Sequence, residues 1–258
     1  MKKYNYAQKI LHKLILSNGF VNKALFEIEK IFFLPSNIKQ ITNNKHIFIT
    51  SLPRSGTTAI LNFIYENDKY GSLTYGDMPF VMSPNLYSKF KIHEKLKNKE
   101  RMHKDGLFFN LATPEAFDEI FFSLYKNVNT KLLQNDFLKY ISLILKYSNK
   151  DHYLSKNNYN YKRINLIKNI FPSSIFISPF RNPLQHAISL LNQHNNFKNL
   201  QNADKFVLDY MNFLKHYEFG NNHRPWFKSI KYHDLNSINY WLEQWFLFYS
   251  NLIENNKH

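Results

Sequence analysis

The sequence contains no cysteine, and only 6 of its 258 residues are glycine. Without cysteine, a disulfide framework and a cysteine-ligated zinc site are both excluded, and the composition fits a reducing compartment. No run of about 18 apolar residues occurs, and polar side chains interrupt the apolar residues near the N-terminus. We therefore expect neither a transmembrane helix nor a signal peptide. The simplest expectation is a cytoplasmic protein.

Acidic residues are also few, since 34 lysines and arginines face 19 aspartates and glutamates and give a formal net charge of +15. A positive surface attracts polyanions. Nucleic-acid modules gather their basic residues in one stripe or arm, whereas the lysines here are scattered along the whole chain. We interpret most of them as solvated surface residues and expect no specific nucleic-acid partner.

Neither an internal repeat nor a low-complexity linker divides the chain, so we expect a single domain over residues 1–258. Residues 1–45 are predicted to form a helical N-terminal extension, because apolar positions recur there at helical spacing and stop before Pro35. This stripe is expected to pack on the domain, and contact with a membrane surface is the alternative. Its members are Ile10, Leu14, Val21, Leu25, Ile28 and Phe32.

Two short β-branched and aromatic runs, residues 46–50 and 174–178, predict buried strands, and each is followed by a loop and a helix. The alternation of such strands with helices indicates an α/β fold. Further helices are expected at residues 57–64, 115–125, 136–147, 159–170 and 184–194, and over most of 203–253 with a break near 220–225.

The loop after the first strand reads Leu52-Pro53-Arg54-Ser55-Gly56-Thr57-Thr58. A small-residue loop between a strand and a helix presents backbone N–H groups to an anion. The nucleoside triphosphate loop requires a lysine directly after its last glycine, but here that position is Thr57, and the basic residue, Arg54, precedes Gly56. The second strand runs into Ser178 and Pro179 rather than a magnesium-binding aspartate. An ATPase, a GTPase and a P-loop kinase are therefore disfavoured.

This segment resembles the 5′-phosphosulfate-binding loop of the sulfotransferases that use 3′-phosphoadenosine 5′-phosphosulfate (PAPS). The resemblance implies a three-layer, P-loop NTPase-like fold with a central parallel sheet flanked by helices, and PAPS as co-substrate without a metal. Backbone N–H groups from Ser55 to Thr58, with the Thr57 and Thr58 hydroxyls, would hold the 5′-phosphate around Gly56. Arg54 would stabilise the charge that develops as the sulfuryl bond breaks.

A second element points to the same family. Arg181 follows the second strand, and Ser189 lies eight residues later on the next helix, about two turns away, so that both side chains can converge on one group. The pair resembles the family's 3′-phosphate-binding element, with a forked contact from arginine and a neutral one from serine. A surface salt bridge for Arg181 and no specific role for Ser189 are the alternatives.

The remaining catalytic candidates follow from the same resemblance. Lys156 occupies the place where relatives have a lysine beside the sulfuryl group, and is our candidate for stabilising charge there; a solvated loop lysine is the alternative. Transfer also needs a base for the acceptor's proton. Asp77 is the first candidate, with a helix-capping role as its alternative. His103, which Asp105 could orient, is the second. Residues 216–220 are a weaker candidate for lining the acceptor site.

The acceptor is the least defined part of the prediction. We expect a hydroxyl or amine on a small molecule, a lipid or a carbohydrate, with peripheral membrane contact as an option. The aromatic residues Trp226, Tyr240, Trp241 and Trp245 are expected in the core rather than in a binding platform. The family pattern continues beyond the last predicted helix, so we also expect a shortened or truncated C-terminal end. A non-catalytic nucleotide-binding protein on the same fold is the alternative function.

Overall fold

The structure, a computed structural model, describes residues 5–91, 99–100, 108–115, 117–126 and 128–254. Its contacts divide the chain into two compact units. The first unit comprises residues 1–50 and 58–177, and the second comprises residues 51–57 and 178–258. We describe each unit by itself, and the single domain remains a prediction.

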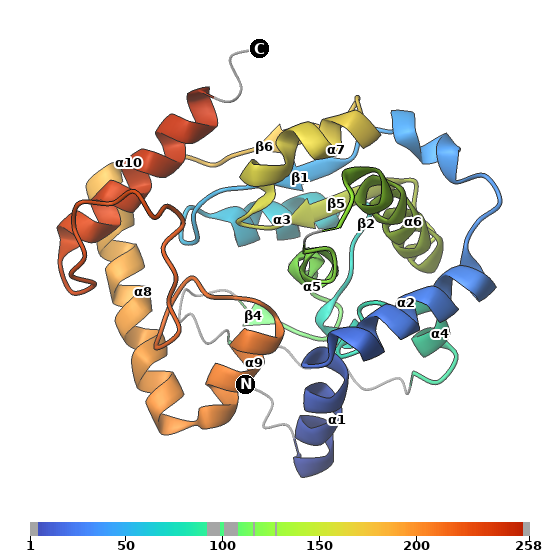
Figure 1. The fold of residues 1–258 in the computed structure, drawn as a ribbon, viewed down its shortest axis with the longest axis horizontal. Helices are drawn as coiled ribbons and strands as arrows, with labels where there is room; N and C mark the ends of the chain where they lie inside the picture. Colours follow the sequence, from blue (N-terminus) through green and yellow to red (C-terminus); the bar gives the residue numbers. More distant parts are fainter. Residues whose placement is uncertain (1–4, 92–98, 101–107, 116, 127, 255–258) are drawn as a thin grey trace. The chain divides into compact units, whose positions relative to one another are not determined.

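The first unit is built on a parallel sheet with the strand order β2-β5-β1-β6 (Figure 1). Both predicted strands are present, as β1 (Ile47–Ile49) and β6 (Ile175–Ile177). The sequence analysis missed β2 (Tyr70–Gly71) and β5 (His152–Lys156), and β5 is the strand that pairs with β1. Strand β6 is not fully buried as expected: it ends the strand order, and Ile175 is exposed. A separate antiparallel pair joins β3 (Lys99–Glu100) to β4 (Phe108–Phe109).

Alternation along the central strand separates the two faces of this sheet. Ile47 and Ile49 pack with Leu61 of α3 (Thr57–Tyr65) and with Leu154 of β5. Phe48 points the other way and stacks on Phe171, which follows α7 (Ile164–Ile170). Phe171 in turn contacts Phe137 of α6 (Thr130–Ser148). The sheet therefore lies between helices on both faces, which confirms the predicted three-layer α/β arrangement.

The other helices of the first unit differ from the expectation mainly in their ends. Helix α6 begins six residues earlier than predicted, since Asn129 caps it by accepting a hydrogen bond from the Lys131 N–H. The helix predicted at 115–125 is only α5 (Asp118–Ser123). The remaining elements are α1 (Tyr6–Leu16), α2 (Gly19–Phe33), α4 (Pro84–Ser88), and the 3₁₀ helices η1 (Ile38–Asn43), η2 (Tyr75–Asp77) and η3 (Asn160–Arg163).

Over its described residues, 51–57 and 178–254, the second unit contains the loop 51–57 and three helices. They are α8 (Pro183–Ala203), α9 (Lys205–Phe213) and α10 (Ile238–Glu254). Helix α10 packs along α8, and α9 also packs on α8. The non-helical stretch between α9 and α10 is longer than the predicted break. Trp226, Tyr240 and Trp241 are buried as expected, whereas Trp245 is half-buried.

The predicted stripe of the N-terminal helices does not face the core. Ile10, Leu14, Ile28 and Phe32 are exposed, so the expectation that this stripe packs on the domain is wrong for these four residues. The buried positions instead include Ile15, Leu16 and Phe26, together with the polar residues His12, Asn22 and Glu29. Because polar residues occupy inward positions, the hydrophobic pattern did not predict which face of each helix is buried.

Within the residues that the structure describes, no helix is long and apolar enough to cross a membrane.

Candidate functional site

The loop 51–57 of the second unit has an unusual backbone at two positions. Gly56 has φ +96° and Arg54 has φ +70°. The first is easily adopted because glycine lacks a Cβ atom. The second is uncommon for a residue with a side chain and costs on the order of 1–3 kcal/mol. Such strain persists only where surrounding contacts impose it, and the loop has several.

Arg54 contacts both residues predicted from the second element, one through its side chain and the other through its backbone. Its Nε donates to the Ser189 Oγ at 3.3 Å, and the Arg181 guanidinium donates to the Arg54 carbonyl at 3.2 Å. Arg181 precedes α8, and Ser189 lies in its second turn. The structure thus brings Arg54, Arg181 and Ser189 together within the second unit, and two guanidinium groups and one hydroxyl converge there.

Further hydrogen bonds hold the loop and link it to the Pro179 carbonyl and to α10. The Ser51 hydroxyl lies 3.0 Å from the Pro179 carbonyl oxygen and 2.8 Å from the Tyr249 hydroxyl of α10. Tyr249 also donates to that carbonyl, at 2.8 Å. Within the loop, the Ser55 hydroxyl donates to the Leu52 carbonyl. Residues from α10 and from the segment before α8 therefore hold the loop in its strained conformation.

His186, in the first turn of α8, makes another contact with the loop backbone. Its Nε2 lies 2.7 Å from the Pro53 carbonyl oxygen, and because a carbonyl only accepts, Nε2 must carry the proton. The side chain is fully buried, and burial lowers the pKa of His186 to about 4. His186 is therefore a neutral donor at physiological pH, positioned against the loop. The sequence analysis did not single it out.

We expect His186 to contribute less stability in acid, because protonation places a charge on a fully buried side chain. Its folded-state pKa is about 4, below the ordinary 6.5, so the stability that depends on a neutral His186 is complete above pH 6.5 and is lost as the pH falls toward 4. The difference in unfolding free energy between wild type and His186→Gln should shrink by about 1–2 kcal/mol between pH 7.5 and 5. Urea unfolding at both pH values measures it. The exposed His233, changed to Gln, is the control, and a pH-independent difference for His186 would contradict the expectation.

Lys156, in the first unit, is not the solvated loop lysine that was the alternative for it. It ends β5 opposite Ile49 in the register with β1, and its side chain is only 10% exposed. Its Nζ lies 2.9 Å from Glu115 Oε1, and the Tyr75 hydroxyl donates to Glu115 Oε2 at 2.5 Å. Glu115 was missed by the sequence analysis, since its partner lies 41 residues away.

Asp77, the first candidate for the base, is fully buried and strongly engaged. One carboxylate oxygen accepts from the backbone N–H and the hydroxyl of Thr74, at 2.7 and 2.9 Å. The other accepts from Lys91 at 2.8 Å and from Tyr147 at 2.6 Å. These contacts include the capping interaction that was the structural alternative. Four donors leave little room for an acceptor hydroxyl, and the role of Asp77 as base stays a prediction.

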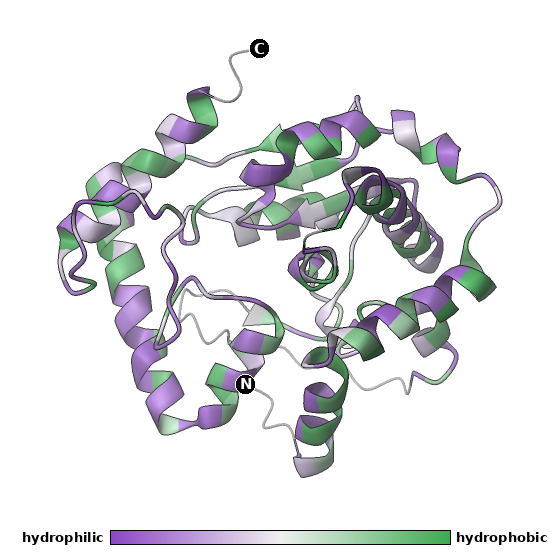
Figure 2. Cartoon of the chain, in the orientation of Figure 1, coloured by the Kyte–Doolittle hydropathy of each residue, from purple (hydrophilic) through white to green (hydrophobic). Residues whose placement is uncertain are grey.

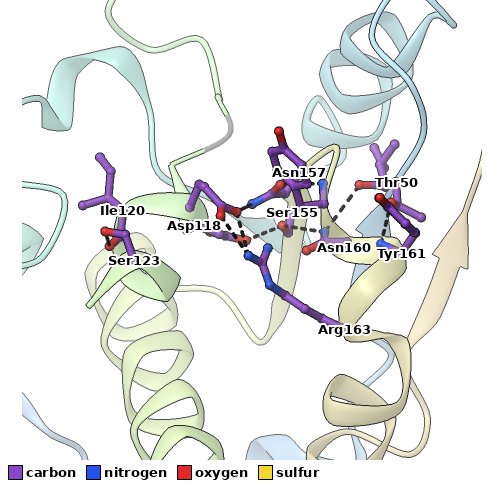
Figure 3. A network of polar contacts seen from close by, with 12 residues as sticks. Thr50, Asp118, Ile120, Ser123, Ser155, Asn157, Asn160, Tyr161 and Arg163 are labelled. Atoms are coloured by element: carbon purple, nitrogen blue, oxygen red, sulfur yellow. Dashed lines mark hydrogen bonds and ion pairs between the residues drawn. The ribbon is translucent and has the colours of Figure 1, made fainter. Parts of the chain in front are cut away.

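A buried polar network lies where β1 and β5 end (Figure 3). Asp118 of α5 accepts hydrogen bonds from the hydroxyls of Ser155 and Tyr153, and Arg163 binds the neighbouring Glu119 at 2.8 Å. Burial raises the pKa of Asp118, while the two hydroxyls and the Arg163 charge oppose that rise. The network fixes the strand end that carries Lys156.

The hydroxyl of Thr50, the last residue before the loop, accepts from the Tyr161 N–H at 2.9 Å (Figure 3). On the other side of the loop, Thr57 and Thr58 open α3. Thr57 is buried, and Gly56 is exposed.

His103 and Asp105, the second candidate pair for the base, lie outside the described residues.

Three comparisons relate the chain to known proteins. No curated protein matches the chain in sequence. Two crystal structures match weakly, each at 12% identity and a TM-score of 0.45: sulfotransferase STF1 from Mycobacterium tuberculosis and sulfotransferase STF9 from Mycobacterium avium. The alignments cover 80% of this chain and 67% of STF1, and 84% of this chain and 64% of STF9, so the chain spans about two thirds of their lengths. The sequence profile described as "Sulfotransferase family" matches residues 46–240, well over half of the chain. The chain therefore belongs to the sulfotransferase family.

Proposed function

We propose that the protein transfers the sulfuryl group of PAPS to a hydroxyl or amine acceptor. The observation that carries the proposal is the contact of Arg54 with Arg181 and Ser189. The motifs predict that Arg54 acts at the 5′-phosphosulfate of one nucleotide and that Arg181 and Ser189 bind its 3′-phosphate. Family membership supports sulfuryl transfer as the reaction class.

The chemistry of these residues fits such a ligand. Two guanidinium groups supply forked, charge-assisted donors for phosphate, and the Ser189 hydroxyl supplies a neutral one. Backbone N–H groups at the start of α3 favour a negative charge, and the exposed Gly56 lets an anion approach the backbone closely. We assign Ser55, Gly56, Thr57 and Thr58 to the 5′-phosphate, and Arg181 and Ser189 to the 3′-phosphate.

When bound, PAPS supplies a sulfuryl group on a phosphate leaving group. Arg54 stabilises the negative charge that develops on that phosphate. To do so, its side chain must give up the hydrogen bond to Ser189 and bind the ligand instead. Lys156 has the corresponding task at the sulfuryl oxygens. The hydrogen bond to Glu115 orients the Lys156 ammonium.

A carboxylate or imidazole must take the acceptor's proton as the acceptor attacks sulfur in line with the leaving phosphate. Asp77 and His103 are the candidates from the sequence. Replacing each by its amide or by glutamine and measuring the pH dependence of transfer would identify the base.

The class of acceptor and the cellular location are proposed on general chemical grounds. A small molecule, a lipid or a carbohydrate would each present the hydroxyl or amine that the reaction needs. The absence of cysteine favours a cytoplasmic location. PAPS would be bound without a metal.

The proposal is tested by ligand-induced thermal stabilisation. The desulfated product, 3′-phosphoadenosine 5′-phosphate, should raise the melting temperature by roughly 5–10 °C at about 100 times its Kd, and ATP with magnesium should not. Arg181→Ala and Ser189→Ala should each lose at least half of this rise, because each removes a donor to the 3′-phosphate. Arg224→Ala, an exposed arginine of the same unit, is the control.

Two results would count against the proposal. If Arg181→Ala and Ser189→Ala both keep the full rise, the assignment of the 3′-phosphate group is wrong. If the product binds but labelled sulfate is transferred from PAPS to none of a panel of phenols, sugars and lipids, the protein is the non-catalytic nucleotide-binding alternative.

A further inference from the structure

Helices α1 and α2 present large apolar side chains to solvent. Figure 2 shows hydrophobic residues recurring along both helices. Tyr6 and Phe20 are 81% and 82% exposed, and Ile31 and Phe32 are 75% and 71% exposed. On α1, Tyr6, Ile10 and Leu14 follow one another at intervals of four residues, and so form one stripe. We call this set the apolar face; it consists of Tyr6, Ile10, Leu14, Phe20, Ile31 and Phe32.

The inward faces of the same helices carry polar residues that have specific partners. The Asn22 amide donates to the Ile15 carbonyl at 2.7 Å, and so joins α2 to α1. Glu29 accepts from the backbone N–H and the amide of Asn85, both at 2.7 Å. The two helices are therefore fixed in rotation by hydrogen bonds, and the outward position of the apolar face is imposed by the fold.

The charge around the apolar face is positive. Residues 1–45 contain eight lysines and two glutamates, with no arginine or aspartate, and one of the glutamates is the buried Glu29. Lys13 is exposed three residues after Ile10, and Lys23 is exposed three residues after Phe20. Each helix thus places a lysine at the border of its exposed apolar residues.

We propose that α1 and α2 bind the surface of an anionic lipid bilayer, with the apolar face in the acyl boundary and the lysines at the headgroups. Exposed apolar residues bordered by lysines are the pattern of helices that lie in a membrane interface. A second copy of the chain would bring two positive surfaces together, and a nucleic acid would leave the apolar side chains without a partner. Membrane docking is a property beyond sulfuryl transfer and depends on none of the residues assigned to PAPS.

Vesicle sedimentation of the full-length protein tests the proposal. We expect binding to vesicles of phosphatidylcholine with about one third phosphatidylserine, and much weaker binding to phosphatidylcholine alone. The triple variant Phe20→Ser, Ile31→Ser, Phe32→Ser should bind at least about tenfold more weakly, because it removes apolar area from the interface. The matched control is Phe246→Ser with Ile253→Ser, two exposed apolar residues of α10 in the second unit, and it should bind as the wild type does.

A second variant separates charge from apolar contact. Lys9→Gln, Lys13→Gln, Lys23→Gln should also weaken binding at least about tenfold, and added salt should reduce the difference between this variant and the wild type. The melting temperature and the shift with 3′-phosphoadenosine 5′-phosphate should be unchanged in both triple variants, which keeps this proposal separate from the PAPS assignment.

Three outcomes would overturn membrane docking. The first is a wild-type protein that fails to sediment with the phosphatidylserine vesicles. The second is a Phe20, Ile31 and Phe32 variant that binds like the wild type. The third is a concentration-dependent dimer in light scattering that the same variant abolishes, which would make the apolar face a contact between copies.

Discussion

Lys156→Met should lower kcat for sulfuryl transfer at least about 100-fold, while the thermal shift with 3′-phosphoadenosine 5′-phosphate persists. Removing a single preorganised positive group from a site where negative charge develops has an effect of this size. The product lacks the sulfuryl group, so its binding does not depend on a lysine that acts there. Labelled sulfate transfer, with an acceptor that the wild type uses, measures the first effect.

The same substitution should also destabilise the fold, and a second change separates the two effects. Lys156→Met leaves Glu115 as a buried carboxylate without its ammonium partner, which costs about 3–5 kcal/mol. Adding Glu115→Gln removes that charge and should restore most of the unfolding free energy without restoring transfer. Recovery of transfer in the double variant would show that Lys156 acts only through stability.

Lys91→Met provides the matched control. Lys91 also pairs with a buried carboxylate of the first unit, that of Asp77, at 2.8 Å. Its loss should lower stability much as the loss of Lys156 does, but transfer by the protein that stays folded should remain within a few-fold of wild type. Equal losses of kcat in the two variants would contradict the role assigned to Lys156.

Asp118→Ala should lower the free energy of unfolding by about 3–5 kcal/mol. Asp118 is buried, and it accepts hydrogen bonds from the hydroxyls of Tyr153 and Ser155, which are themselves buried. Removing the carboxylate deprives both hydroxyls of this acceptor and opens a cavity beside β5. Urea denaturation measures the loss.

Two comparisons make this prediction specific. Asp118→Asn keeps one acceptor oxygen and should lose clearly less stability than the alanine variant. Asp68→Ala removes an exposed carboxylate, which pairs with Lys150 on the surface, and should leave the denaturation midpoint unchanged within error. If Asp118→Ala behaves like Asp68→Ala, the network in Figure 3 does not stabilise the strand ends.

The elements with strong local signals were predictable. The loop 51–57 lies between β1 and α3 as expected, because a β-branched strand, a glycine and a helix-forming run mark each boundary. Arg181 and Ser189 converge on Arg54 because two helical turns separate positions on the same side of a helix.

The features that depend on distant partners were not predictable. Strand β5 has polar ends and a short buried centre, so it acquires strand character only by pairing with β1. Glu115 became a site candidate only through Lys156. The phase of α2 depends on Glu29 meeting Asn85, a contact between residues 56 positions apart. In each case a long-range polar contact outweighed the local hydrophobic pattern.

The hydrogen bonds that hold the loop have a consequence for the order in which the parts of the protein fold. Residues 51–57 leave the ribosome early, but the side chains that bind the Pro53 and Arg54 carbonyl groups belong to His186 and Arg181. The loop therefore cannot take up its left-handed conformation at Arg54 while the first unit folds during synthesis. It must wait for the segment that carries Arg181 and His186, so the anion-binding loop matures only after the strands of the first unit have been translated.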